Sequence, residues 1–190
     1  TVLVIDGGPD DPLSRGRSFV LYGADATLVS ATTRMDENQI DIQFEVPGSD
    51  ATGNDRWYLG FQSRNYWEKL TAGHYPGAVK DHIRDLPLLW IVGNGVEPGD
   101  PRSPSMVDGE FTVHEISMTW PDVHSFSASF EQGCNGSPHD RLYGEIRYNA
   151  SGGFKAAQAR PWTADFGEID NGTRTTTKTV TVRSIGTQPV

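Results

Sequence analysis

Apolar and polar residues alternate along several short stretches of the chain, as expected for β-strands with one buried and one solvated face. The clearest of these stretches are residues 40–46, 57–61, 126–130 and 142–148. A turn-rich segment separates the last two, so we expect them to pair as a hairpin. Shorter strands are predicted at residues 2–5, 18–21 and 27–31. The continuous apolar run 88–93 is typical of a strand that is covered on both faces.

The alternation changes phase within residues 111–120. Phe111 and Val113 lie on one parity, whereas Ile116 and Met118 lie on the other. A strand that keeps its apolar side chains on one face through such a change needs one extra residue. We therefore expect a β-bulge near His114–Glu115.

The architecture follows from what the pattern contains and what it lacks. No long stretch shows the period of an amphipathic helix, and residues 76–87 fit either a short helix or a strand followed by a bend. The 21 Gly and 12 Pro residues separate the short strands with turns. We predict an all-β fold, an antiparallel β-sandwich or jelly-roll-like single domain over residues 1–160. Residues 47–55 and 93–109 are expected to form loops at its ends.

The composition changes near residue 160. The motifs Asp165-Phe166-Gly167, Asn171-Gly172 and Ser184-Ile185-Gly186 resemble the opening strands of the ASPM/SPD-2/Hydin type of immunoglobulin-like repeat. The resemblance implies that residues 161–190 form a linker and the first strands of a following repeat, seen as a C-terminal β-hairpin extension. A complete domain of this kind needs about 100 residues. We therefore expect the chain to be part of a larger multidomain protein.

Charge and hydropathy narrow the range of partners. The chain has 16 Lys and Arg against 25 Asp and Glu, a net charge of −9, and no basic run. Nucleic acid is therefore not an expected partner. No apolar stretch approaches the roughly 20 residues of a membrane helix, so we expect no membrane insertion.

Residues 126–149 carry a second resemblance. Their strands read Phe-x-x-x-Phe-Glu-Gln-x-Cys and Leu-Tyr-Gly-x-Ile-Arg-Tyr-Asn, and Gly109, Phe111 and Val113 precede them. This pattern is similar to that of uncharacterised β-sandwich modules in secreted bacterial multidomain proteins. The resemblance implies a secreted or cell-surface location but no activity. It also implies a second cysteine before the Gly-x-Phe strand, which this chain lacks in residues 93–109.

Cys134, the only cysteine, lies five residues before His139, which Asp140 follows. The three residues allow a nucleophile with its base, part of a metal site, or simply the loop of a hairpin. Ser, Gly, Pro and Asn surround the cysteine, and no oxyanion-type motif is visible, which favours the loop. The single Cys and five scattered His also lack zinc-site spacing.

Three carboxylates gather in the N-terminal segment "IDGGPDDP": Asp6, Asp10 and Asp11. Oxygen ligands on a Gly-rich loop suit Ca²⁺, although Asp, Gly and Pro are also ordinary turn formers and the spacing is not that of an EF-hand. We expect no cofactor other than a structural Ca²⁺ at these residues.

Aromatic residues cluster between positions 57 and 75. On a sandwich, Trp57, Leu59 and Phe61 would face the core and Tyr58 the opposite side of the sheet. Tyr66 and Trp67 fall in a polar stretch beside Arg64, where exposed rings would suit sugar stacking. The alternative is that these rings cover the end of the sandwich as part of its core.

Three functions stay open. The first is a noncatalytic structural or interaction module of a secreted or cell-surface protein, with another protein as partner. The second is a carbohydrate-binding module that takes a glycan on Tyr58, Arg64, Tyr66 and Trp67 and uses Ca²⁺ to support the fold. The third, a glycan-active enzyme, needs paired acidic groups. Glu131, Glu145 and Arg147 share a predicted sheet face, for which ion pairing is the commoner explanation.

Overall fold

The computed structural model describes residues 1–47, 54–80, 85–93, 108–133, 139–151, 157–160, 179 and 181–184. The chain divides into two compact units, Thr1–Ser151 and Gly152–Val190. Several sequence predictions lie outside the described residues: most of the loops 47–55 and 93–109, Cys134, and the Asp165-Phe166-Gly167 and Asn171-Gly172 motifs.

The first unit contains ten strands. They are β1 (Val2–Gly7), β2 (Ser18–Tyr22), β3 (Leu28–Thr33), β4 (Gln39–Pro47), β5 (Asn54–Gln62), β6 (Gly73–Val79), β7 (Leu88–Val92), β8 (Asp108–Thr119), β9 (Asp122–Gly133) and β10 (Leu142–Tyr148). In the second unit, β11 (Ala157–Arg160) pairs antiparallel with β12 (Thr181–Ser184). Strand β11 therefore belongs to the second unit, whereas the sequence analysis set the end of the first domain at residue 160.

No helix occurs among the described residues, and the predicted all-β, mainly antiparallel fold is confirmed. The ambiguous segment 76–87 begins as strand, because β6 runs to Val79, while residues 81–84 lie outside the described part. No helix long and apolar enough to span a membrane is present in the ranges that the structure describes.

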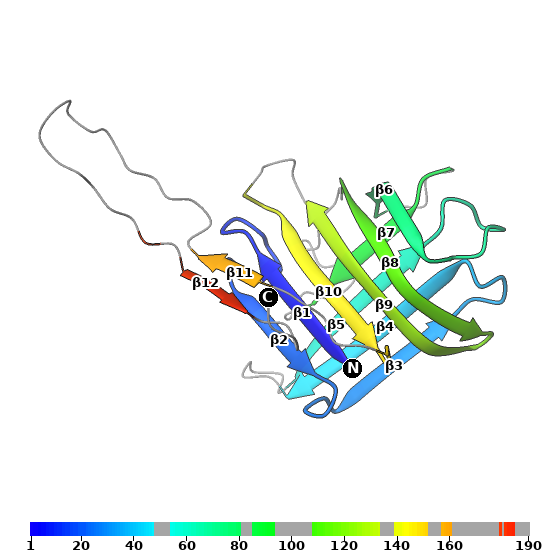
Figure 1. Ribbon diagram of the computed structural model, residues 1–190, viewed down its shortest axis with the longest axis horizontal. Helices are drawn as coiled ribbons and strands as arrows, with labels where there is room; N and C mark the ends of the chain where they lie inside the picture. The colour runs from blue at the N-terminus through cyan, green and yellow to red at the C-terminus, as the bar shows by residue number, and fades with distance from the viewer. Residues whose placement is uncertain are drawn as a thin grey trace, which may run out of the picture. The chain divides into compact units, whose positions relative to one another are not determined.

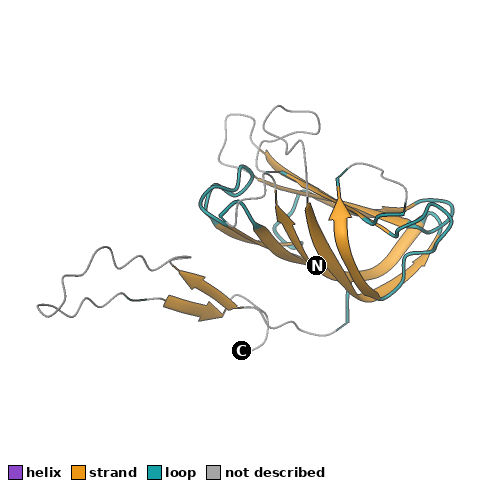
Figure 2. Ribbon diagram, turned by 90° about the horizontal axis from the view of Figure 1, so that it is seen from above, coloured by secondary structure: helices purple, strands orange, loops and turns teal. Residues whose placement is uncertain are grey.

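The ten strands form two layers (Figure 2). They belong to one continuous sheet of order β2-β1-β10-β9-β3-β4-β5-β7-β6-β8, in which β8 also pairs with β9. The sheet folds over so that β2, β1, β10, β9, β8 and β6 form one layer and β3, β4, β5 and β7 the other (Figure 2). Single residue pairs connect them at both sides, Thr32 with Asp122 between β3 and β9, and Val79 with Leu88 between β6 and β7. The strands of the two layers cross in Figure 1, as in sheets packed face to face at a large angle.

The core lies between the layers and follows the alternation of the sequence. Ile40, Ile42 and Phe44 of β4, like Trp57, Leu59 and Phe61 of β5, are at most 2% exposed. The Phe61 ring meets three rings of the opposite layer, with centroids 5.3 Å from Phe111, 5.2 Å from Phe126 and 6.0 Å from Phe130. Aromatic contacts of this kind stabilise a core beyond simple area burial.

Two further sequence predictions are confirmed. Strands β9 and β10 pair as the expected antiparallel hairpin, with Phe126 opposite Tyr148 and Phe130 opposite Gly144. The register of β8 against β9 shifts between Val113 and Glu115, so His114 is the extra residue of a bulge. Because of this bulge, Phe111 and Val113 on one side of it and Met118 on the other all remain buried.

Candidate binding groove

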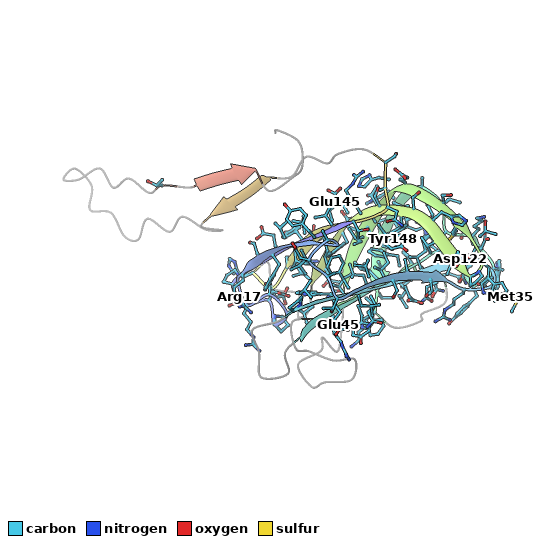
Figure 3. The ribbon with its side chains drawn as sticks, turned by 90° about the horizontal axis from the view of Figure 1, so that it is seen from below. Arg17, Met35, Glu45, Asp122, Glu145 and Tyr148 are labelled. Carbon is cyan, nitrogen blue, oxygen red and sulfur yellow. The ribbon has the colours of Figure 1, made fainter. Side chains whose placement is uncertain are left out.

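The outer face of the β3-β4-β5-β7 layer carries a depression of about 410 Å³. Side chains alternate along each strand, so the residues between the core positions reach this face. Four strands and the turn after β3 contribute to the lining, which consists of Ser30, Thr32, Arg34, Gln39, Asp41, Ile42, Gln43, Tyr58, Leu59 and Trp90. We call this depression the groove. Figure 3 labels Glu45 of the same layer, and Glu145 and Tyr148 of the other.

Strand register places the lining residues in rows across the sheet. Gln43 lies opposite Tyr58, and the next row runs from Asp41 across Gly60 to Trp90. A Cβ atom at Gly60 would lie 3.3 Å from Asp41 Oδ1 and 3.6 Å from Trp90 Cε3. The Asp41 carboxylate, the Trp90 ring and Leu88 therefore pack closely over Gly60, and a larger residue there would displace them.

The floor contains polar atoms whose hydrogen-bonding capacity is not used within the described residues. Gln39 is only 4% exposed, and its Nε2 donates to Asp41 Oδ1 at 2.7 Å. Its Oε1 is buried and has no hydrogen-bond partner there, and the same holds for Trp90 Nε1. Buried polar atoms normally have partners, because leaving them unpaired costs about 1–3 kcal/mol each. Both atoms are shielded from solvent, so the polar groups that a ligand in the groove can reach are those of the partly exposed Asp41 and Gln43 beside them.

An ion pair flanks the aromatic side of the groove. Arg56 Nε lies 3.2 Å from Glu45 Oε2, in the row beside Tyr58. The Glu45 carboxylate, and to a smaller extent Tyr58, raise the pKa of the Arg56 guanidinium. Tyr58 itself is half-buried, so one side of its ring is supported while part of it stays accessible.

Only one of the four ligand-binding residues predicted from the sequence lines the groove; the other lining residues were not predicted. Tyr58 lines it, whereas Arg64, Tyr66 and Trp67 lie in the connection between β5 and β6. Tyr66 is 48% and Trp67 74% exposed, so Trp67 does not cover the end of the sandwich as core.

Sequence reasoning missed Trp90 and the residues around it. The run 88–92 is apolar throughout, and alternation does not distinguish Trp90, because Leu88 and Val92 of the same parity are buried like Leu89 and Ile91. Asp41 and Gln43 were recognised as the solvated face of a strand. Their meeting with Trp90 depends on β5 pairing with β7, which the local pattern does not reveal.

The three carboxylates of the N-terminal segment lie in different surroundings. Asp6 accepts a hydrogen bond from the Ser18 hydroxyl, and Asp10 is exposed. Asp11 is 1% exposed and accepts a hydrogen bond from the backbone N–H of Ser14. Among the described residues, no group of three or more His, Cys, Asp or Glu could hold a metal ion. The Ca²⁺ site therefore stays a prediction, with Asp11 its buried member.

Asp11 lies close to a second buried carboxylate, Asp140, because the two loops run side by side. Gly8 N–H donates to Arg141 C=O at 2.7 Å, and Asp10 N–H donates to His139 C=O at 3.1 Å. Burial raises the pKa of Asp11, hydrogen bonds from Ser14 and Leu13 lower it in part, and the charge of Asp140 raises it further. Two buried acids in proximity favour uptake of a proton or of a cation.

This pair gives a prediction for the variant Asp11→Asn. Since the folded pKa of Asp11 lies above the unfolded value of about 3.9, its destabilising effect is absent at low pH and appears as pH rises through the folded pKa. The asparagine oxygen can still accept from Ser14. We expect Asp11→Asn to melt at a higher temperature than wild type at neutral pH without Ca²⁺, and the difference to vanish towards about pH 4.

Thermal melts across this pH range, with and without Ca²⁺, provide the measurement. A Ca²⁺-dependent rise in wild type that Asp11→Asn lacks would support the Ca²⁺ prediction. The exposed Asp10→Asn serves as the control and should behave as wild type. An Asp11→Asn protein less stable than wild type at neutral pH without Ca²⁺ would contradict the assignment.

The outer face of the other layer is occupied by ion pairs. Arg147 Nη1 lies 3.4 Å from Glu145 Oε1, and Arg141 contacts Asp108 at 2.8 Å and Glu131 at 3.5 Å. Burial raises the pKa of Glu145, and Arg147 opposes this effect. Glu131 and Glu145 thus each have a basic partner on this face, the arrangement of a salt-bridged sheet surface.

No family model, curated protein or solved structure matches this chain. The resemblances to secreted bacterial modules and to immunoglobulin-like repeats stay predictions, and the groove is interpreted from the residues of this chain.

Proposed function

We propose that the chain is a noncatalytic binding module that holds a glycan in the groove of the β3-β4-β5-β7 layer. The observation that carries the proposal is the composition of this groove. Tyr58 and Trp90 supply aromatic surface, and Gln39, Asp41 and Gln43 supply amide and carboxylate groups between them. Sugar rings present apolar C–H faces and many hydroxyl groups, and a site that combines aromatic rings with a few fixed polar groups suits both.

The hydrogen-bonding state of the groove favours a ligand that is rich in hydroxyls. Asp41 and Gln43 line the groove and are partly exposed, and a hydroxyl group can donate to the Asp41 carboxylate and either donate to or accept from the Gln43 amide. The Asp41 carboxylate, already oriented by Gln39, has a second oxygen that can accept from the ligand. A purely apolar ligand would cover the Asp41 carboxylate and the Gln43 amide without pairing them.

The noncatalytic assignment follows from the acids that line the groove. Glycoside hydrolysis ordinarily requires two carboxyl groups about 5–10 Å apart. Among the described lining residues, Asp41 is the single carboxylate. The module would therefore serve a larger secreted or cell-surface protein by attaching it to a glycan, in agreement with the multidomain context that the sequence predicts.

The test begins with the full chain on a glycan array, followed by titration calorimetry with the glycan bound most strongly. We expect Tyr58→Ala to weaken this binding about tenfold, or about 1.4 kcal/mol, because the stacking surface is lost. The matched control is Tyr22→Ala, which removes a ring that is 46% exposed on β2 of the other layer and should not alter binding. Absence of binding by wild type to every glycan, or equal affinity in Tyr58→Ala, would rule out the proposal.

A further inference from the structure

One end of the groove adjoins the connection between β5 and β6, residues 63–72, which we call the aromatic segment because it carries Tyr66 and Trp67. Residues 34–38 form the turn between β3 and β4. Arg34, the first residue of this turn, and Gln39, the residue after it, both line the groove. This turn is bonded directly to the segment. Ser63 N–H donates to Asn38 C=O at 3.0 Å, and Leu70 N–H donates to Glu37 C=O at 3.0 Å.

Side chains strengthen the same junction. Asn38, which is 1% exposed, donates from Nδ2 to the backbone oxygen of Tyr66. Lys69 forms an ion pair with Glu37. Leu70 is fully buried in the core and anchors the end of the segment. The backbone on both sides of Trp67 is therefore fixed to the strands that form the groove.

The segment also holds its own shape. The Ser63 hydroxyl donates to the backbone oxygen of Asn65 at 3.0 Å and also contacts that of Glu68. Glu68 N–H donates to Asn65 C=O at 3.2 Å, which closes a turn around Tyr66 and Trp67. A ring presented on an ordered backbone loses little conformational entropy when it binds a ligand.

Trp67 is left 74% exposed by this arrangement, and Met35 in the adjoining turn 79%. A fixed segment that places a large aromatic side chain in solvent beside a groove is typical of an interaction surface. Because this surface is continuous with the groove, we expect a ligand bound in the groove to extend onto it.

We propose that the binding site continues from the groove over the turn 34–38 onto Trp67, and that the ligand is an extended glycan chain. One part of the chain lies against Tyr58 and Trp90, and a following sugar lies on Trp67. Arg34, where groove and turn meet, donates to the hydroxyl groups between the two. This inference rests on the proposed function of the groove, and it assigns Trp67 to the selection of chain length.

The experiment uses ladders of cello-, xylo-, manno- and laminari-oligosaccharides, from dimer to hexamer, titrated into the full chain. In the series that binds, wild-type affinity should rise with chain length until Trp67 is covered. Trp67→Ala should bind the shortest ligand like wild type and the longest about three- to tenfold more weakly. Trp67→Phe should keep most of the length dependence, Tyr58→Ala should weaken every length, and Tyr22→Ala should change none.

Two failures are distinguishable. If wild type binds no member of any ladder and no glycan on the array, the proposed function of the groove fails, and the extension fails with it. If wild type binds and Tyr58→Ala weakens binding, but Trp67→Ala shows the wild-type length dependence, only the extension is overturned. Equal weakening of short and long ligands by Trp67→Ala would also overturn it.

Discussion

Gly60→Val is expected to abolish glycan binding at a moderate cost in stability. Gly60 lies in the strand-register row between Asp41 and Trp90, two residues that line the groove. The first added carbon would already lie 3.3 Å from Asp41 Oδ1 and 3.6 Å from the Trp90 ring. The two further methyl groups of valine would force the Asp41 carboxylate and the Trp90 ring away from the positions that the ligand requires. Valine suits a strand, so the backbone of β5 should accept it.

Calorimetry with the array-selected glycan measures the effect, and thermal melting measures the cost to the fold. We expect no detectable binding by Gly60→Val, and an unfolding temperature lowered by about 2–12 °C, which corresponds to the cost of about 1–3 kcal/mol for overpacking a close-packed site. Gly60→Ala is the graded control. Its single Cβ requires a small shift of Asp41, so binding should weaken without being lost. A folded Gly60→Val protein with wild-type affinity would place the ligand elsewhere.

The strands and the bulge could be predicted because both depend on local parity. Side chains alternate with a period of two, so the apolar positions from Ile40 to Val46 identify the buried face without knowledge of the partner strand. The phase change around His114 likewise requires an extra residue wherever the strand lies.

The groove could not be predicted to the same extent, because it depends on which strands are neighbours. Strand β7 pairs with β5 although β6 lies between them in the sequence. This pairing brings Trp90 beside Gly60 and hence close to Asp41. Within the sequence, Trp90 is one apolar residue among five, and Gly60 is simply a glycine in a strand.

The acidic N-terminal segment illustrates the same difficulty for electrostatics. Three carboxylates that are neighbours in the sequence differ in exposure, because Asp10 faces solvent while the turn that Asp11 caps directs its carboxylate inward. The neighbouring charge that raises the pKa of Asp11 is that of Asp140, which is distant in the sequence but close in space. The sequence therefore indicated the loop that holds Asp11, but not that Asp140 is the carboxylate close to it.

Phe61→Ala is expected to cost about 3–5 kcal/mol of the free energy of unfolding, the range for a large aromatic side chain removed from a packed core. Phe61 is fully buried and lies on the same strand as Tyr58 and Gly60, facing the opposite way. Its ring contacts Phe111, Phe126 and Phe130 of the other layer. Its loss would leave a cavity where the two layers meet, beneath the groove.

Urea unfolding followed by tryptophan fluorescence provides the measurement, and Tyr22→Ala, on the surface of β2, should stay within about 0.5 kcal/mol of wild type. A cost below about 1 kcal/mol for Phe61→Ala would mean that other contacts hold the layers together. The variant also separates stability from binding. Phe61 does not line the groove, so where Phe61→Ala remains folded it should bind the glycan nearly as wild type does. Gly60→Val should remain folded and fail to bind. These opposite outcomes are expected because one face of β5 packs in the core and the other face binds the ligand.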